Sequence, residues 1–173
     1  MKLSIIIPAY NEERTVAQII EQVHEVDLGD IQKEIIVIDD GSSDKTYIRI
    51  KSVEKNVRSL VPIHLKKNRG KGSAIAIGIK KATGDMVIVQ DADLEYSPSD
   101  IPRLIKPIIQ HKAEVVYGTR LKVAPVFFGK NKTPFITHFF GNKFLSFLTT
   151  VLYGYPVSDM ETGYKAFRRE VLD

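Results

Sequence analysis

The sequence predicts an α/β fold built on a mainly parallel β-sheet. Over the first 120 residues, short apolar runs rich in β-branched side chains alternate with segments of helical periodicity, which is typical of successive βαβ units. The length of 173 residues and the hydrophobic content of 43% suffice for one well-cored domain and are too small for two ordinary ones. We therefore expect a single domain over residues 1–173.

The first βα unit shows the alternation clearly. Leu3 to Ile7 is an apolar run that predicts a buried strand, and Pro8 is expected to end it. Asn11 is the expected N-cap of the following helix, and Glu12 and Glu13 suit its positive end. One face of this helix carries apolar residues at i, i+3, i+4 and i+7: Val16, Ile19, Ile20 and Val23.

The later elements follow in the same order. Further strands are expected at residues 34–38, 61–65, 85–90 and 114–117. Further helices are expected at residues 47–57, from 68–72 to 83–84, and along an apolar stripe at residues 101–109. Pro107 lies inside that last stripe and should bend or shorten the helix.

Polar clusters follow the predicted strands. In open α/β sheets, ligands bind outside the carboxyl ends of the strands, where these loops collect. We therefore expect one site for a metal and a diphosphate, built from residues 8–12, 39–43, 68–72, 91–95 and 118–120.

Asp91-Ala92-Asp93 has the most direct chemistry of these clusters. In an extended segment, carboxylates two residues apart point to one side and can converge on a hard cation, Mg²⁺ or Mn²⁺, with Glu95 as a further ligand. Such a cation bridges diphosphate oxygens and stabilises a departing nucleoside diphosphate. A solvated turn explains the same residues without any metal, so the motif alone does not decide.

The other clusters also have two explanations each. Residues 39–43 form either a tight turn with a helix cap or a carboxylate site for a nucleobase or ribose. Tyr10 either follows a strand end or packs on a nucleobase. Residues 68–72 form either a simple loop or a set of backbone and Lys71 donors that face phosphate.

Charge and aromatic side chains are concentrated in the later part of the chain. The net charge is +4, and residues 115–158 contain no Asp or Glu, five Lys or Arg, and seven of the eight Phe. This composition favours an anionic and apolar partner, such as a membrane surface or a lipid phosphate, and not a nucleic acid. No apolar run approaches the roughly 18 residues that span a bilayer, so we expect residues 123–157 to lie on the membrane, although their apolar helical stripe is equally explained as core.

The chain has no cysteine, so any metal must be held by oxygen or histidine ligands. The N-terminus enters a strand directly and lacks the features of a signal peptide. We expect a cytoplasmic protein, peripheral on the cytoplasmic face of a membrane.

Five motifs, in this order and at these spacings, resemble family 2 glycosyltransferases: IIPAYNE (6–12), VIDDGSSD (37–44), NRGKG (68–72), ATGD (82–85) and QDADLE (90–95). The resemblance covers essentially the whole chain and implies the GT-A fold, which is Rossmann-like. YGTR (117–120) and SDMETGYKAFRR (158–169) look like the dolichyl- and polyprenyl-phosphate branch. Relatives usually continue beyond the position of Asp173, so we expect the chain to be truncated at its C-terminus.

The resemblance and the loop chemistry together assign site residues. The nucleotide sugar is expected to contact Pro8, Tyr10, Glu12, Ile38, Asp40, Lys71, Asp91, Ala92 and Asp93. The metal is expected at Asp91, Asp93 and Glu95, and the catalytic residues are expected to be Asp93, Asp159, Arg120 and Arg168. The two arginines would face the donor diphosphate or the acceptor phosphate, with Lys165 and Arg169 as secondary candidates.

The implied reaction is inverting transfer of a hexose from a donor of the UDP-glucose or GDP-mannose type to dolichyl or polyprenyl phosphate. Such a phosphate is already anionic, since its second pKa is about 6. A sugar-hydroxyl acceptor, as in glycan or polysaccharide synthesis, would need a general base, for which Asp159 is the candidate and Glu161 the second choice. Outside the enzymes, a nucleotide-sugar binding module is the alternative.

Overall fold

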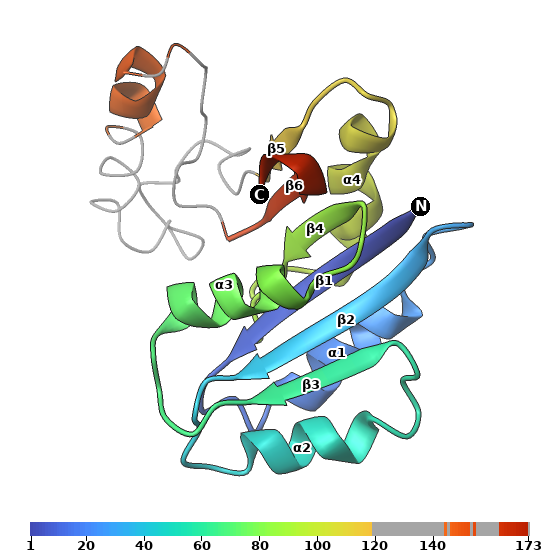
Figure 1. Ribbon diagram of the computed structural model, residues 1–173, viewed down its shortest axis with the longest axis vertical. Coiled ribbons are helices and arrows are strands. Elements are labelled where there is room, and N and C mark those ends of the chain that lie inside the picture. The colour runs from blue at the N-terminus through green and yellow to red at the C-terminus, as the bar shows by residue number, and fades with distance from the viewer. Residues whose placement is uncertain (119–143, 145, 153, 155–162, 173) are drawn as a thin grey trace, which may run out of the picture. The chain divides into compact units, whose positions relative to one another are not determined.

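The computed structural model describes residues 1–118, 144, 146–152, 154 and 163–172 (Figure 1). The chain divides into two compact units, Met1–Val116 with Gly163–Asp173, and Tyr117–Thr162. The strands are β1 (Lys2–Ala9), β2 (Gln32–Asp39), β3 (Leu60–His64), β4 (Met86–Val89), β5 (Val115–Tyr117) and β6 (Lys165–Arg168). The α-helices are α1 (Val16–Glu25), α2 (Thr46–Val53), α3 (Lys71–Lys81) and α4 (Ile101–Ile109), and short 3₁₀ turns lie at Pro98–Asp100 and Arg169–Val171.

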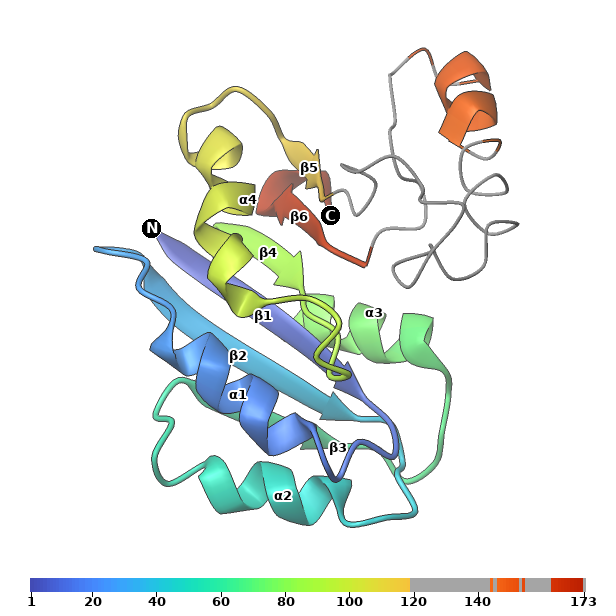
Figure 2. The ribbon, with the colours of Figure 1, turned by 180° about the vertical axis from the view of Figure 1, so that it is seen from behind.

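The predicted α/β fold with a mainly parallel sheet is confirmed. The strand order is β3-β2-β1-β4-β6-β5, and β1 pairs in parallel with both β2 and β4. Figures 1 and 2 show α3 on one face of the sheet and α1, α2 and α4 on the other. Each face has its own apolar core, so β1 is buried from both sides.

β6 was not predicted from the sequence. It begins about 75 residues after the end of β4 and inserts between β4 and β5, antiparallel to β4. Its four residues, Lys165–Arg168, are too few and too polar to show strand periodicity.

Two local expectations in the first βα unit are wrong. Pro8 does not end β1 but lies inside it, opposite Ile38. The backbone groups of Ile6 point toward β4, and the Ile6 carbonyl accepts the last hydrogen bond between the two segments, from the Gln90 N–H. The backbone of Pro8 points the same way, beyond that bond. The N–H that proline lacks therefore removes no hydrogen bond from the sheet. Asn11 does not cap α1.

The expected cap is displaced because the chain turns before the helix begins. Asn11 has a φ of +56°, which asparagine tolerates better than most residues, and its side chain accepts a hydrogen bond from the Ser43 backbone at 2.9 Å. Helix α1 begins at Val16, after Thr15, and its apolar stripe is buried as predicted. Asn11 therefore joins the turn after β1 to the turn after β2.

Candidate active site

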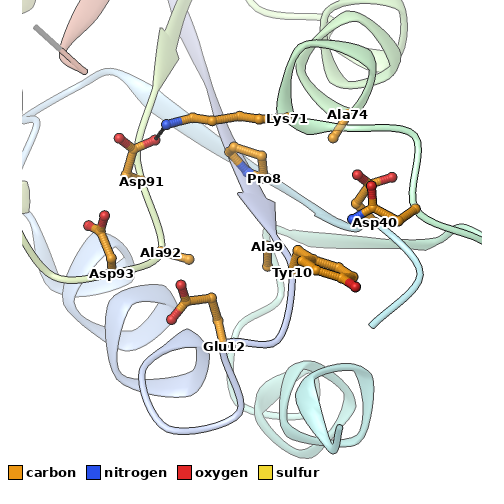
Figure 3. A pocket seen from close by; sticks show the side chains of 11 residues that line it. Pro8, Ala9, Tyr10, Glu12, Asp40, Lys71, Ala74, Asp91, Ala92 and Asp93 are labelled. Carbon is orange, nitrogen blue, oxygen red and sulfur yellow. Dashed lines mark ion pairs between the residues drawn. The ribbon is translucent and has the colours of Figure 1, made fainter. Parts of the chain in front are cut away.

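A pocket of about 290 Å³ opens beyond the carboxyl ends of β1, β2 and β4 (Figure 3). It is lined by Pro8, Ala9, Tyr10, Glu12, Asp40, Asn68, Lys71, Ala74, Asp91, Ala92 and Asp93. Figure 3 shows Tyr10 and Asp40 on one side of it and Asp91 and Asp93 on the other. Four of the five predicted loops therefore contribute to one pocket at the expected edge of the sheet.

Asp91 is the most buried carboxylate on its side of the pocket, with 9% of the residue exposed. The ammonium of Lys71, the first residue of α3, lies 2.6 Å from Asp91 Oδ1. The contact is an ion pair without hydrogen-bond geometry, and within the described residues Oδ1 accepts no hydrogen bond. Lys71 is therefore the neighbour that balances the charge of this buried oxygen.

Asp93 lines the same pocket from a turn and not from an extended segment. Its Oδ1 accepts a hydrogen bond from the Glu95 backbone at 3.0 Å. Leu94 has a φ of +64°, so the chain reverses there and the exposed Glu95 side chain does not line the pocket. The predicted set of three metal-binding carboxylates is therefore wrong, and no group of three such ligands occurs within the described residues.

The remaining pair has the chemistry that a hard divalent cation prefers. Two carboxylates, Asp91 and Asp93, line one cavity, and one of their oxygens is buried without a hydrogen bond among the described residues. Mg²⁺ bound at protein sites commonly keeps several waters and uses one or two carboxylates plus substrate phosphates. The residues present fit such an ion.

Asp40 organises the loop that leads into α3. The residue is 2% exposed, and its carboxylate accepts backbone hydrogen bonds from Arg69 at 2.9 Å and Gly70 at 2.8 Å. Gly41 has a φ of +70°, and a Cβ placed on it would lie 2.5 Å from the backbone of Lys67. The turn after β2 thus holds the loop before Lys71 by direct backbone contacts.

Tyr10 and Glu12 form the open side of the pocket. Tyr10 is 47% exposed, so a flat aromatic surface is available to a ligand. Glu12 is fixed at both ends, because its backbone N–H donates to Thr46 Oγ1 at 2.8 Å and its carboxylate accepts from Thr15 Oγ1 at 2.6 Å. This side offers stacking and hydrogen-bonding groups and no cationic side chain among the described residues.

Two predicted site residues lie away from the pocket. Ile38 is fully buried beneath α3, because it belongs to the second apolar core, and it does not line the pocket. Arg168 pairs with Met86 at the start of β4, the end of the sheet opposite the pocket, because β6 runs antiparallel to β4. Its guanidinium contacts the Ile108 carbonyl at 3.2 Å and His111 Nδ1 at 2.7 Å.

The structure therefore places Arg168 away from this pocket, and its role at a phosphate stays a prediction. The same register places Lys165 opposite Val89, at the pocket end of β4. Arg169 lies beside Arg168 at the far end, where its backbone donates to the Asp85 carbonyl at 3.0 Å. Of the three cations in this motif, only Lys165 lies near the pocket edge.

The family profile described as "Glycosyl transferase family 2" matches residues 4–173. This chain belongs to glycosyltransferase family 2. It is 36% identical over 185 residues to a UDP-N-acetylglucosamine–dolichyl-phosphate N-acetylglucosaminyltransferase of Methanococcus voltae, covering 97% of this chain and 70% of that protein. It is 32% identical over 174 residues to an undecaprenyl-phosphate 4-deoxy-4-formamido-L-arabinose transferase of Photorhabdus laumondii, covering 99% of this chain and 50% of that protein. The family 2 chain thus spans 50% to 70% of the length of these relatives.

Solved structures of glycosyltransferases share the fold of this family 2 chain. One is the glucosyl-3-phosphoglycerate synthase of Mycobacterium tuberculosis in complex with Mn²⁺, UDP and phosphoglyceric acid, with a TM-score of 0.71, 22% identity, and coverage of 98% of this chain and 56% of that one. Another is a mannosyltransferase of Pyrobaculum calidifontis in complex with GDP-Man and Mn²⁺, with a TM-score of 0.68, 22% identity, and coverage of 98% and 45%. The predicted GT-A fold is confirmed.

The family 2 chain contains a buried network beside Asp91 that sequence reasoning missed. Gln90 is fully buried, and its amide donates to the backbone carbonyls of Asp91 and Tyr96 at 3.1 and 3.2 Å. The Tyr164 hydroxyl lies 2.5 Å from Gln90 Oε1. Burial raises the pKa of Tyr164, so the hydroxyl keeps its proton and can donate it. A Cβ placed on Gly163 would lie 2.7 Å from Asp91 Oδ2. A polar residue at the end of an apolar strand was the available signal for this network.

The other predicted site residues of the family 2 chain, Arg120 and Asp159, lie outside the described residues, as does Glu161. Most of the predicted interfacial segment 123–157 also lies outside them. Within it, residues 146–152 are helical, with Phe147, Val151 and Leu152 more than half exposed. The described residues contain no helix long and apolar enough to cross a membrane. The role of this segment stays a prediction.

Proposed function

We propose that this family 2 chain transfers a hexose from a nucleoside diphosphate sugar to a dolichyl or polyprenyl phosphate, with inversion at the sugar carbon that is attacked. The observation that carries the proposal is the pocket in which Asp91 and Asp93 lie opposite Tyr10 and Asp40 at the carboxyl ends of three parallel strands. The named relatives, which transfer to dolichyl or undecaprenyl phosphate, support the acceptor class.

The donor would lie across the pocket with its nucleoside toward Tyr10. The exposed tyrosine ring gives a surface on which a uracil or guanine packs. The pocket residues Pro8, Ala9 and Glu12 come from the same segment as Tyr10. The Asp40 carboxylate holds the loop before Lys71, from which Asn68 lines the pocket. Solved neighbours that share the fold hold UDP or GDP-mannose, which supports a UDP- or GDP-sugar.

The diphosphate and sugar would lie toward Asp91 and Asp93. These carboxylates would hold Mg²⁺ or Mn²⁺, which, when bound, stabilises the charge that develops on the departing nucleoside diphosphate. Lys71 adds a cationic donor from the N-terminus of α3, where helix geometry also favours an anion. Ala92 is 4% exposed, so it packs the loop and leaves the two flanking carboxylates to the ligand.

The chemical step would be a single displacement. An oxygen of the lipid phosphate attacks the anomeric carbon, and the bond from that carbon to the diphosphate oxygen breaks, leaving a nucleoside diphosphate and a hexosyl lipid phosphate. The attacking phosphate is already ionised, since its second pKa is about 6, and needs no strong base. Arg120 stays our candidate for holding a phosphate, and Asp159 stays our candidate general base for a sugar-hydroxyl acceptor. We propose that the protein acts peripherally on the cytoplasmic face of a membrane.

The donor half of the proposal is tested by calorimetric titration of UDP-glucose and GDP-mannose into the chain, with Mn²⁺ and with a chelator. We expect Mn²⁺-dependent binding of one donor, lost in Asp93→Ala. Glu95→Ala is the matched control, because it removes a carboxylate two residues away that does not line the pocket. Equal loss of binding in both variants, or donor binding unaffected by the chelator, would contradict the proposed metal site.

The acceptor half is tested with the same chain, the donor so identified, and vesicles that contain undecaprenyl phosphate. We expect release of the nucleoside diphosphate to require the lipid phosphate, and Tyr10→Ala to weaken donor binding without lowering the unfolding temperature, because its ring is half exposed. If turnover occurs only with a sugar hydroxyl as acceptor, the proposed lipid phosphate acceptor is wrong and the acceptor is a glycan. Donor binding without any turnover would favour a binding module.

A further inference from the structure

We propose that Lys71 competes with the divalent cation for Asp91, and that this competition makes the binding of cation and nucleotide cooperative. The inference rests on the proposed function, because the cation and nucleotide are those of that reaction. It goes beyond a phosphate-binding role for Lys71, since it assigns the same ammonium two alternative partners.

The competition follows from the position of the Lys71 ammonium. It lies 2.6 Å from Asp91 Oδ1, so an Mg²⁺ ion held at about 2.1 Å from the same oxygen would meet a like charge. The other oxygen of Asp91, Oδ2, lies beside the backbone of Gly163, where an added Cβ would be 2.7 Å from it. A cation that binds Asp91 through Oδ1 therefore has to displace Lys71.

Lys71 can leave Asp91 without disturbing the fold. Its side chain is 58% exposed, whereas the side chain of Asp91 is only 11% exposed. The backbone before Lys71 is fixed separately, through the bond from the Gly70 N–H to Asp40 at 2.8 Å. The ammonium can thus swing while the start of α3 stays in place.

The charge balance of the pocket gives the displaced ammonium a second partner. Among the described lining residues there are four carboxylates, Glu12, Asp40, Asp91 and Asp93, and one cationic side chain, Lys71. Such a surface repels a diphosphate until a cation is bound. A diphosphate held by the cation would then lie beside the N-terminus of α3 and would give the freed ammonium an anionic partner.

Cooperativity is the thermodynamic consequence. A cation that binds alone breaks the Lys71–Asp91 ion pair and leaves Lys71 without a partner. When nucleotide is bound as well, Lys71 forms a new ion pair with the phosphate in place of the one with Asp91. By linkage, each ligand then raises the affinity for the other by the same factor. Removing the ammonium should abolish this contribution while leaving direct metal–phosphate contacts in place.

The test is Mn²⁺ binding in the absence of nucleotide, followed by the loss of the free-Mn²⁺ signal in electron paramagnetic resonance, for the wild-type chain and Lys71→Met. We expect the variant to bind Mn²⁺ about three- to tenfold more tightly, because a partly exposed ion pair has been removed. We expect UDP or GDP to bind Lys71→Met more weakly than wild type in saturating Mn²⁺. Lys81→Met, at the exposed far end of the same helix, is the matched control and should change neither affinity by more than about twofold.

The outcomes separate the possible roles of Lys71. Mn²⁺ affinity that is unchanged in Lys71→Met means that the lysine serves only phosphate, and affinity that falls means that it positions Asp91; either result overturns the competition. Wild-type chain that binds nucleotide but no Mn²⁺ would overturn the inference and the proposed metal together. Thermal unfolding of each variant shows whether a change in affinity is only a loss of fold.

Discussion

The contribution of Glu34 to the free energy of unfolding should depend on pH. Its carboxylate lies at the end of the sheet opposite the pocket and accepts four hydrogen bonds. The donors are the Lys2 ammonium at 2.9 Å, the Ser4 hydroxyl at 2.6 Å, and the Thr83 backbone and hydroxyl at 2.9 and 2.8 Å. One side chain of β2 thereby holds the start of β1 and the turn that leads into β4.

The perturbation is Glu34→Gln, studied as a function of pH. Burial raises the pKa of Glu34, but the hydrogen bonds from Ser4, Thr83 and Lys2 outweigh it and lower the pKa from 4.5 to about 2. A carboxyl whose pKa is lowered by folding contributes stability above its unfolded pKa, and this contribution is lost as the pH falls toward the folded pKa. At about 1.4 kcal/mol per pH unit, wild type should lose about 2 kcal/mol from this group between pH 6 and pH 3.

The assay is urea unfolding, followed by far-ultraviolet circular dichroism, at several pH values between 6 and 3. Other titrating groups contribute equally to both proteins, so the difference in free energy of unfolding between wild type and Glu34→Gln should shrink by about 2 kcal/mol over this range. Glu21→Gln, on the exposed face of α1, should run parallel to wild type. Parallel curves for wild type and Glu34→Gln would refute the reasoning.

Three further substitutions test packing and the buried network. Gly78→Ala places a Cβ 2.5 Å from Ile6 under α3 and should lower the free energy of unfolding by about 1–3 kcal/mol, measured by denaturant titration. Gly41→Ala, at a φ of +70° and against the facing loop, should destabilise the chain by about 1–3 kcal/mol and weaken nucleotide binding, measured by calorimetry. Tyr164→Phe should lower the free energy of unfolding by about 1–3 kcal/mol, because it removes the hydroxyl that lies 2.5 Å from Gln90 Oε1 and 2.8 Å from the Ser97 carbonyl. An unchanged temperature of thermal unfolding would contradict these contacts.

The first part of the fold was predictable because its local patterns agree with its packing. The stripe beginning at Val16 is buried as its spacing predicts, and β2 and β4 extend over the apolar runs that predict them. Pro8 and Asn11 were misplaced because their effect depends on neighbours far along the chain. Whether a proline ends a strand depends on what lies beside its missing N–H, and here β4 has already ended.

The site was predictable where side chains follow parallel strands and not where they follow β6. Asp40, Lys71, Asp91 and Asp93 reach one pocket because parallel strands end at one edge of the sheet. Arg168 was misplaced because the sequence did not reveal that its strand runs the other way. The positions of Ile38 and Glu95 relative to the pocket depend on the three-dimensional structure. Ile38 is buried in the core, and Glu95 follows the chain reversal at Leu94.

The register of the central strands explains why the two sides of the pocket stand apart. Pairing between β1 and β4 ends at Ile6 opposite Val89, whereas pairing between β1 and β2 continues to Ala9 opposite Asp39. At about 3.3 Å per residue, this stagger sets the chain after β4 back by about 10 Å from the end of β1. Tyr10 and the carboxylates of Asp91 and Asp93 therefore stand at opposite sides of the pocket (Figure 3), because the two ladders stop at different residues. The stagger thus separates the groups that we propose to bind the nucleoside from those that we propose to bind its diphosphate.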